Sequence, residues 1–322
     1  MSLALHLPAS EKQRFISDIR DLWNGARQGH MIEWEYSDPL QSTDRARGSE
    51  YWDQAAHYGG YYLYQEEAEL IQRAAHKVAQ AVGSIASLVE LGPGKSEKLL
   101  PLANVIDAEE IIGIDLSEDF LQYFGQAMSD AGKPIRLIEN NFFEDISVLH
   151  NSALVCCLGS TLLNLPMTDE GRFDQGAFIG LLNMWKRRMP KGTHLLLGFD
   201  TNQNTRTLNA AYDQPYIRAM TESVWHRAMR DLPIENFNPY GISYRGEWDA
   251  RHMVYKHMGV CTIDQTVYLN GERFDLKKGH SFCQSNSFKL PTSYLERLFI
   301  KAGFKPPEWY ESDQMALALI TV

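Results

Sequence analysis

The chain has 322 residues, of which 44% are hydrophobic and 22% charged, so it can bury one large core or two interlocked ones. Its 31 lysines and arginines against 41 aspartates and glutamates give a net charge of −10, which argues against DNA or RNA as a partner because few counterions would be released. No apolar run reaches membrane-spanning length and the first residues lack the basic start of a signal peptide, so we expect a cytoplasmic protein without a membrane partner.

The first residues and the centre of the chain differ in pattern. Residues 1–60 are aromatic and predict helices. Beyond them, apolar strand-like runs alternate with helical patterns: the strands are expected at 87–91, 110–115, 135–140, 153–160 and 194–200, and the helices near Ser96, at Ser117 and over 176–189. Ser117 is a suitable N-cap, because Glu118 and Asp119 supply an acidic first turn.

The last third of the chain predicts a long helix and then extended segments. The helix is expected over 209–229, and the extended segments over 252–263, 266–274 and 280–290. Asn270 and Gly271 are suited to a hairpin turn. A final helix over 293–303, capped by Gly303, precedes two short closing strands.

Strands that alternate with helices predict an α/β fold, with a mainly parallel sheet that carries helices on both faces. The simplest organisation is a doubly wound core that is interrupted by a smaller α+β cap domain. We expect the core to comprise residues 62–202 plus 290–322, and the cap to comprise residues 1–61 plus 203–289.

The cysteines and histidines do not predict a metal site or a disulfide. The four cysteines lack CxxC spacing, which is typical of buried thiols in a reducing compartment. His252 and His257 fall in one predicted strand, but their odd separation places them on opposite faces. We therefore expect neither a metal nor a disulfide.

The glycine turn within residues 88–98 (LVELGPGKSEK) decides the ligand class. A P-loop requires a glycine five residues before Gly94, and Val89 occupies that position. A dinucleotide turn requires a third glycine where Glu97 stands, and a carboxylate there would repel a phosphate. ATP is therefore excluded and NAD is disfavoured.

An acidic strand end and a short glycine turn remain, Glu90 to Gly94, with Asp115 at the tip of the next strand. An acid at that second position commonly binds ribose hydroxyls. Together they favour an adenosine ligand that carries no phosphate and bears positive charge, S-adenosylmethionine (SAM), with S-adenosylhomocysteine as the product. A nicotinamide oxidoreductase would also use Gly92, Gly94 and Asp115, and a non-catalytic sensor of SAM or amino acids would keep the same pocket.

Four motifs, in order, resemble one family: YYLYQEEAELI, LVELGPGKSEK, CLGSTLLNL and LLLGFDTNQNTRTLNAAYD. They are similar to the bacterial histidine Nα-methyltransferases of ergothioneine biosynthesis, over residues 34–322. Relatives methylate tryptophan-type amines in fungi and arginine in a natural-product pathway. The resemblance implies a Rossmann-like class I methyltransferase sheet, a second, smaller substrate domain, and N-methylation of a free amino acid in a closed pocket between the two domains.

The resemblance also implies the residues that bind the donor. These are the residues of the glycine turn, the strand-end aspartate, the pair beside the adenine and the pair near the methionine moiety: Gly92, Gly94, Lys98, Asp115, Asn141, Phe142, Gly159 and Ser160.

For the amino-acid substrate, the resemblance implies Tyr61, Asn164 and Tyr212, with Tyr36 near the reacting amine. Tyrosine hydroxyls and an amide can satisfy a buried amine and carboxylate without adding charge. Without the resemblance, Tyr61 and Tyr212 could equally be core aromatic residues. Tyr36 is the candidate that relays the departing proton. The expected partner is a small-molecule amino acid, with no nucleic acid, membrane or metal, and the protein is expected to be a monomer or a weak dimer.

The substrate side chain is where this sequence departs from the family. Met253 and Ser287 match the family's methionine and serine, but Ser285 stands where a glutamate reads the imidazole of histidine. A one-residue slip would offer Gln284 or Asn286, and neither is a carboxylate. We therefore do not expect histidine as the substrate. A larger aromatic amino acid is one alternative, and the guanidino group of arginine is another, with Glu247 and Asp249 as candidate acids.

Overall fold

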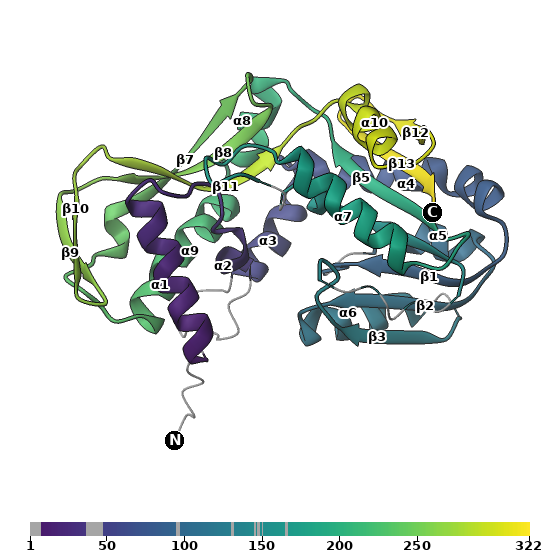
Figure 1. Ribbon diagram of the computed structural model, residues 1–322, viewed down its shortest axis with the longest axis horizontal. Coiled ribbons are helices and arrows are strands. Elements are labelled where there is room, and N and C mark those ends of the chain that lie inside the picture. The colour runs from purple at the N-terminus through teal and green to yellow at the C-terminus, as the bar shows by residue number, and fades with distance from the viewer. Residues whose placement is uncertain are drawn as a thin grey trace. The chain divides into compact units, whose positions relative to one another are not determined.

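A computed structural model describes residues 8–36, 48–94, 97–129, 132–144, 146, 149, 151–164 and 167–322 (Figure 1). The chain divides into two compact units. Unit 1 comprises Met1–Tyr61, Met167–Phe173 and Gln203–Phe288, and unit 2 comprises Tyr62–Pro166, Asp174–Asn202 and Lys289–Val322.

Unit 2 is built on one seven-stranded sheet with the order β12-β13-β5-β4-β1-β2-β3. The strands are β1 (Ile85–Leu91), β2 (Ala108–Asp115), β3 (Ile135–Glu139), β4 (Ala153–Cys157), β5 (His194–Asp200), β12 (Glu308–Glu311) and β13 (Met315–Thr321). Strands β1 to β5 pair in parallel, whereas β13 is antiparallel to both of its neighbours. The predicted α/β fold with a mainly parallel sheet is confirmed.

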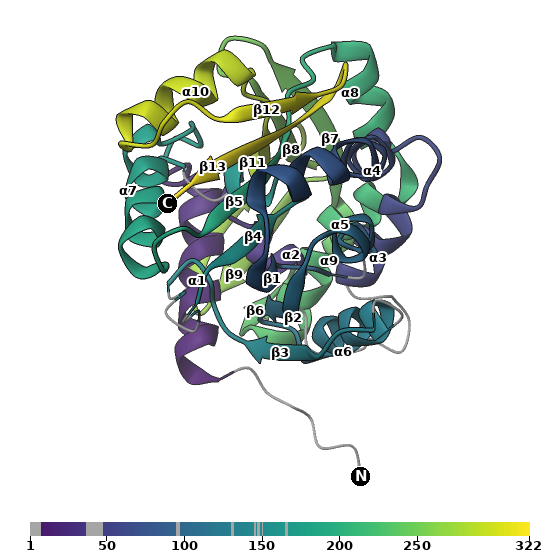
Figure 2. The ribbon, with the colours of Figure 1, turned by 90° about the vertical axis from the view of Figure 1, so that its right-hand side faces the viewer.

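Helices cover both faces of this sheet. They are α4 (Tyr62–Val82), α5 (Leu100–Val105), α6 (Glu118–Met128), α7 (Gln175–Arg188) and α10 (Thr292–Lys301). Figure 2 shows α4, α5 and α6 on one face and α7 and α10 on the other. Ser117 caps α6 as predicted, because its hydroxyl accepts the Phe120 N–H at 3.3 Å. The helix expected near Ser96 has its predicted start outside the described residues, and α5 begins at Leu100.

Strand order in unit 2 fixes where a ligand can bind. The connection from β1 leads to β2 on one side, whereas β4 pairs with β1 on the other side. In open α/β sheets, ligands bind outside the carboxyl ends of the strands at such a switch point. The loops after β1, β2 and β4 are therefore the expected binding edge.

Unit 1 combines helices with two three-stranded antiparallel sheets, ordered β10-β9-β6 and β11-β8-β7. Its helices are α1 (Ala9–Trp23), α2 (Ile32–Tyr36), α3 (Gly48–Ala56), α8 (Thr205–Tyr212) and α9 (Pro215–Asp231). Its strands are β6 (Ile234–Glu235), β7 (Ile242–Asp249), β8 (Val254–Cys261), β9 (Gln265–Leu269), β10 (Glu272–Leu276) and β11 (Ser281–Phe288). Short 3-10 turns lie at Thr161–Leu163 in unit 2 and at Pro239–Gly241 in unit 1.

Two predictions for unit 1 were wrong in detail. The single helix predicted over 209–229 is two helices, because Gln214 is extended and caps α9 through the Tyr216 N–H, with Pro215 as the first helical residue. His252 does not share a strand with His257, since β8 begins only at Val254. The hairpin turn at Asn270 and Gly271 is confirmed, with φ angles of 50° and 81° between β9 and β10.

The core of unit 1 lies between α1, α9 and the strands. Trp23 of α1 stacks on Trp225 of α9 with ring centroids 5.9 Å apart, and Phe274 packs edge-on against Trp23 at 5.2 Å. All four cysteines are buried free thiols. Within the described ranges, no helix combines the length and apolar character needed to span a bilayer.

A substitution at Gly113 in β2 can test how closely β2 packs against α6. A Cβ at this position would lie 2.6 and 2.8 Å from ring atoms of Phe124, which is fully buried. Gly113→Ala should therefore lower the free energy of unfolding by about 1–3 kcal/mol, as measured by chemical denaturation. Gly180→Ala is the control, because nothing lies within 4 Å of its Cβ on the exposed side of α7. If Gly113→Ala is as stable as wild type, the described packing is wrong.

Candidate functional site

The glycine turn after β1 forms the first part of the candidate donor site. Gly92 and Gly94 have φ angles of 65° and 55°, a conformation that favours glycine. The Gly92 N–H donates to the Ile114 carbonyl at 2.8 Å, which keeps the turn against β2. A Cβ on Gly92 would meet the Phe142 ring at 3.5 Å, so the turn leaves backbone exposed beside an aromatic face.

Asp115 ends β2 at the same edge of the sheet as the glycine turn. One carboxylate oxygen accepts the Ser117 N–H at 2.9 Å. Burial raises the pKa of Asp115, and backbone hydrogen bonds from Ser117, Gly94 and Leu116 oppose this shift. The carboxylate is therefore tied to the glycine turn and still has capacity to accept further donors.

Glu67 of α4 connects two of the loops at this edge. Its carboxylate is fully buried and accepts the Gly159 N–H at 2.8 and 2.9 Å, in the loop after β4. It also pairs with the Lys98 ammonium at 2.5 Å, in the segment after the glycine turn. Burial alone lowers the Lys98 pKa, but the charge and hydrogen bond of Glu67 raise it above its ordinary value.

Glu90 stands one residue before the end of β1 and is 1% exposed. Its Oε2 atom has no hydrogen-bond partner among the residues that are described. Burial raises the Glu90 pKa to about 8, Lys98 lowers it, and Glu67 and Asp115 raise it further. This buried acceptor suits a ligand that brings a positive charge or an N–H donor.

The loop after β4 has an unusual backbone. Gly159 and Ser160 both have positive φ, 72° and 59°, and only the first is a glycine. The Ser160 hydroxyl accepts the Asp200 N–H at 3.1 Å, which holds this residue in the left-handed conformation. Asp200 in turn pairs with the buried Lys289 ammonium at 2.6 Å and accepts the Tyr62 hydroxyl at 2.8 Å. Such strain often occurs at binding sites.

Asn141 and Phe142 follow β3. The Asn141 amide donates to Glu144 at 3.0 Å and accepts the Phe143 N–H at 3.1 Å, so both ends of the amide have partners within their own turn. Phe142 is buried, and its carbonyl accepts the Trp185 indole N–H at 3.1 Å. Phe142 therefore presents a fixed aromatic ring to Gly92.

Asn164 follows the 3-10 turn after β4. Its backbone N–H donates to the Thr161 carbonyl at 3.2 Å. Its side-chain Oδ1 atom is buried, and within the described part of the chain it has no hydrogen-bond partner. Asn164 and Glu90 thus supply two unsatisfied acceptors after neighbouring strands of one sheet.

Unit 1 brings the predicted substrate tyrosines into one aromatic cluster. Trp52 packs edge-on against Tyr36 at 5.7 Å and against Tyr61 at 5.3 Å. Tyr212 lies 5.9 Å from Tyr61 and stacks on Tyr255 at 4.6 Å. Burial, and then the charges of Glu35 and Tyr212, raise the Tyr36 pKa well above its usual value, so the Tyr36 phenol stays protonated near neutral pH.

The two predicted serines of β11 join this cluster through different partners. The Ser287 hydroxyl lies 3.1 Å from His257 Nε2, and His257 Nδ1 lies 3.1 Å from the Tyr244 hydroxyl. The Ser285 hydroxyl lies 2.9 and 3.1 Å from the two oxygens of Glu35. The positions that replace the family's glutamate offer no carboxylate, but α2 supplies one, Glu35, beside Ser285.

Three other sequence-predicted residues lie elsewhere. Met253 is outside β8, at the turn after β7, with φ of 53°. Asp249 pairs with the Lys256 ammonium and the His252 ring, and these hydrogen bonds lower its pKa although partial burial raises it. Glu247 is about half exposed and lies 3.7 Å from Arg245. Both acids thus have ion-pair partners in β7 or β8, and their part in the substrate site stays a prediction.

Comparisons with known proteins identify the family of this chain. Residues 34–322 match the family described as "Histidine-specific methyltransferase, SAM-dependent". The chain belongs to this family. The predicted family, its class of enzyme and its SAM donor are thereby confirmed.

Individual relatives are distant. N-methyltransferase fsqC of Aspergillus fumigatus is 20% identical over 78% of this chain and 69% of its own length. Histidine N-alpha-methyltransferase of Mycobacterium tuberculosis is 30% identical over 52% of each chain, so this match spans about half of that relative. Among solved structures, the sugar N-methyltransferase KedS8 from Streptoalloteichus sp ATCC 53650 matches with a TM-score of 0.44 and 14% identity, over 88% of this chain and 96% of that chain.

Two functional candidates in this family member were not predicted from the sequence. Glu67 occupies a core position of α4, because Leu63, Leu70 and Ile71 share its buried face. A carboxylate on an apolar helical stripe was the signal that could have found it. Glu35 lies in a short aromatic stretch between Trp34 and Tyr36, and no pattern in the sequence connects it with Ser285, 250 residues away.

The raised pKa of Glu90 makes stability depend on pH. Below about pH 4.5 the carboxyl is neutral in both states, and between 4.5 and 8 only the unfolded chain releases the proton, so stability is lost as the pH rises. Glu90→Gln removes this loss. Without ligand, the variant should melt on the order of 5 °C above wild type at pH 8, and nearly level with it at pH 5.

Differential scanning calorimetry at both pH values measures this difference. Glu109→Gln is the matched control, because Glu109 is exposed on the neighbouring strand β2 and its replacement should change neither melting temperature. A Glu90→Gln variant that melts below wild type at pH 8 would contradict the described burial of Glu90.

Proposed function

We propose that the protein transfers the methyl group of SAM to the amine of a free amino acid or a close derivative. The observation that carries this proposal is that two buried acceptors of unit 2, Glu90 Oε2 and Asn164 Oδ1, find no hydrogen-bond donor among the described residues. Buried acceptors without donors are costly unless a ligand satisfies them. A cationic donor and an amine acceptor would bring N–H groups and positive charge to these atoms.

For SAM, the residues of unit 2 provide a consistent set of contacts. Asp115 would accept the ribose hydroxyls, and Phe142 would pack beside the adenine, with Asn141 at its edge. The methionine part of the ligand would lie against the backbone of Gly92, Gly94, Gly159 and Ser160. The Glu67–Lys98 ion pair would hold the two loops that contain these residues in place. Glu90 would accept from the amino group of the ligand. Phosphate has no place in this set, because carboxylates stand where a phosphate would bind.

For the amino acid, the proposal uses the aromatic cluster of unit 1. Tyr61 and Tyr212 would hold the amine and carboxylate, and Ser285 and Ser287 would face the side chain. Met253 would contact the substrate side chain from the turn that precedes β8, not from the strand itself. We propose that unit 2 holds the donor and unit 1 holds the acceptor.

The chemistry requires orientation more than acid–base catalysis. SAM supplies an activated methyl group on a sulfonium centre. The chain positions the amine lone pair, which must lie about 3 Å from the methyl carbon, and excludes water. An α-amine has a reference pKa of about 7.7–8.0, so a neutral fraction is present near neutral pH. Tyr36 stays protonated and would orient the amine and relay its proton.

Methylation of an arginine guanidino nitrogen is a second candidate. The observation that favours it is Glu35, a buried carboxylate within the aromatic cluster of unit 1. A guanidinium group is a good partner for a carboxylate because it can bind both oxygens at once.

Mass spectrometry tests the proposed function directly. Wild-type protein is incubated with SAM and each of the twenty amino acids, with hydroxylated and ornithine-type relatives in parallel. We expect one of them to gain one or more methyl groups, and fragmentation assigns the nitrogen. If no amino acid is methylated and the protein binds NADH instead of SAM, the proposed function is wrong.

Asp115→Asn tests the ribose contact. The amide oxygen can still accept the Ser117 N–H, but the carboxylate charge is lost, so affinity for S-adenosylhomocysteine should fall at least about 30-fold. Isothermal titration calorimetry measures this change. Glu118→Gln is the control, because Glu118 is exposed on α6 and its replacement should leave the affinity within about twofold of wild type.

A further inference from the structure

Glu35 is a buried carboxylate with very few donors. It is 1% exposed, and the Ser285 hydroxyl is within hydrogen-bond distance of both oxygens. One hydroxyl proton serves one oxygen at a time, so at least one oxygen can accept another donor. Among the residues that the structure describes, Glu35 forms no ion pair, and its pKa is raised by burial to about 8.

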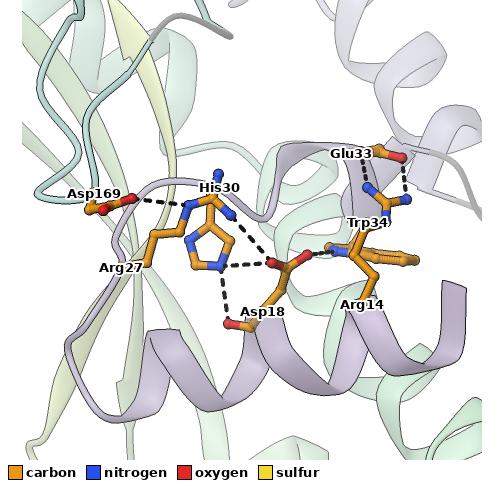
Figure 3. Close-up of polar contacts among 7 residues, drawn as sticks. All are labelled: Arg14, Asp18, Arg27, His30, Glu33, Trp34 and Asp169. Atoms are coloured by element: carbon orange, nitrogen blue, oxygen red, sulfur yellow. Dashed lines mark hydrogen bonds and ion pairs between the residues drawn. The ribbon is translucent and has the colours of Figure 1, made fainter. Parts of the chain in front are cut away.

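The fold fixes the position of Glu35 from both sides. Upstream, the Met31 N–H donates to the Gln284 carbonyl at 2.8 Å, and His30 forms a bridge with Ser285, so the chain enters α2 along β11. The residues before Glu35 are held by α1, as Figure 3 shows. Glu33 binds Arg14 at 2.6 and 2.7 Å, and the Trp34 indole donates to Asp18 at 2.8 Å.

A third contact holds the other side of α2. The Arg227 guanidinium of α9 donates to the Trp34 carbonyl at 3.0 Å and lies 5.0 Å from the centre of the Trp34 ring. Arg227 is therefore engaged by Trp34, and it also lies 3.5 Å from Asp231. Arg227 thus has other partners, and the described residues supply no ion-pair partner for the Glu35 carboxylate.

The surroundings of Glu35 favour a cation. Tyr36 follows it in the chain and belongs to the cluster with Trp52, Tyr61 and Tyr212. The faces of tyrosine and tryptophan rings attract cations without the need for a formal negative charge. A carboxylate within such a cluster, with one hydroxyl to orient it, is suited to bind a guanidinium or an ammonium group.

We propose that Glu35 binds the cationic end of the substrate side chain and that Ser285 orients its carboxylate. The substrate is then an amino acid whose side chain ends in a guanidinium or an ammonium group. This inference rests on the proposed function, and it names the class of acceptor. A neutral side chain of the same shape leaves the buried carboxylate unpaired and is rejected for that reason.

Two pairs of amino acids isolate the side-chain charge. Citrulline has the shape of arginine without its charge, and norleucine resembles lysine without its ammonium group. Both members of each pair carry the same α-amine and carboxylate. We expect arginine over citrulline, or lysine over norleucine, by about 100-fold in kcat/KM and in affinity for protein saturated with S-adenosylhomocysteine.

The decisive variant is Glu35→Gln. It should reduce that preference by about 100-fold, almost entirely because the cationic member of the pair binds more weakly. The affinity for the neutral member should stay within a few-fold of the wild-type value. Ser285→Ala should reduce the preference less, by about 5- to 10-fold, because the carboxylate remains. Glu235→Gln is the matched control, since Glu235 is an exposed carboxylate on β6 of the same unit, and it should leave the preference unchanged.

Affinity for S-adenosylhomocysteine, measured for every variant, verifies that each variant is folded. If Glu35→Gln weakens the binding of both members of a pair equally, Glu35 binds the α-amine that they share, and the inference is wrong. If wild type prefers citrulline and Glu35→Gln keeps that preference, Glu35 acts as a neutral donor and the inference is again wrong. Equilibrium binding distinguishes these outcomes without turnover, so absence of methylation alone would overturn only the proposed function.

Discussion

The donor side of this protein depends on one buried carboxylate. Glu67 lies on the core face of α4, binds the Gly159 N–H in the loop after β4, and pairs with Lys98 in the segment after the glycine turn. A single side chain thereby fixes two loops at the binding edge of the sheet. Gly198 shows how closely it is packed, because a Cβ there would lie 2.0 Å from Glu67 Oε1. Since Lys98 compensates this charge, Glu90 has one oxygen without a hydrogen-bond partner among the described residues, and we propose that a ligand satisfies it.

Unit 1 also contains a buried carboxylate, Glu35, but the described residues do not compensate its charge as Lys98 compensates that of Glu67. The hydrogen bonds of Glu33 and Trp34 to α1 hold α2 in place, and among the described residues the buried Glu35 carboxylate has only the Ser285 hydroxyl as a donor. A compensated carboxylate holds the structure together, whereas an uncompensated one is costly to bury, and we propose that a cationic ligand offsets this cost. Each unit therefore contains one buried acid whose partner the described residues do not supply. For a reaction between a cationic donor and an amine, this is the expected arrangement of charge.

Much of this arrangement followed from the sequence because the signals were local. Strand periodicity predicted the sheet, Ser117 predicted the start of α6, and the spacing from the glycine turn to Asp115 predicted the donor edge. The break at Gln214 was missed although Pro215 marked it, because the helical pattern continues on both sides. The partnership of Glu35 with Ser285 could not be predicted, since it depends on how the segment before α2 pairs with β11. Ser285, which stands where the family has a glutamate, even argued against a carboxylate there.

Carboxylates at the ends of β1 and β2 are proposed to bind a positively charged adenosine ligand, and the donor site depends on this assignment. A crystal structure of the protein with S-adenosylhomocysteine tests it most directly. We predict the ribose hydroxyls on Asp115 and the ligand's amino group on Glu90, each at about 2.6–3.2 Å. A ligand bound elsewhere, or a Glu90 that remains unpartnered in the complex, would contradict the assignment.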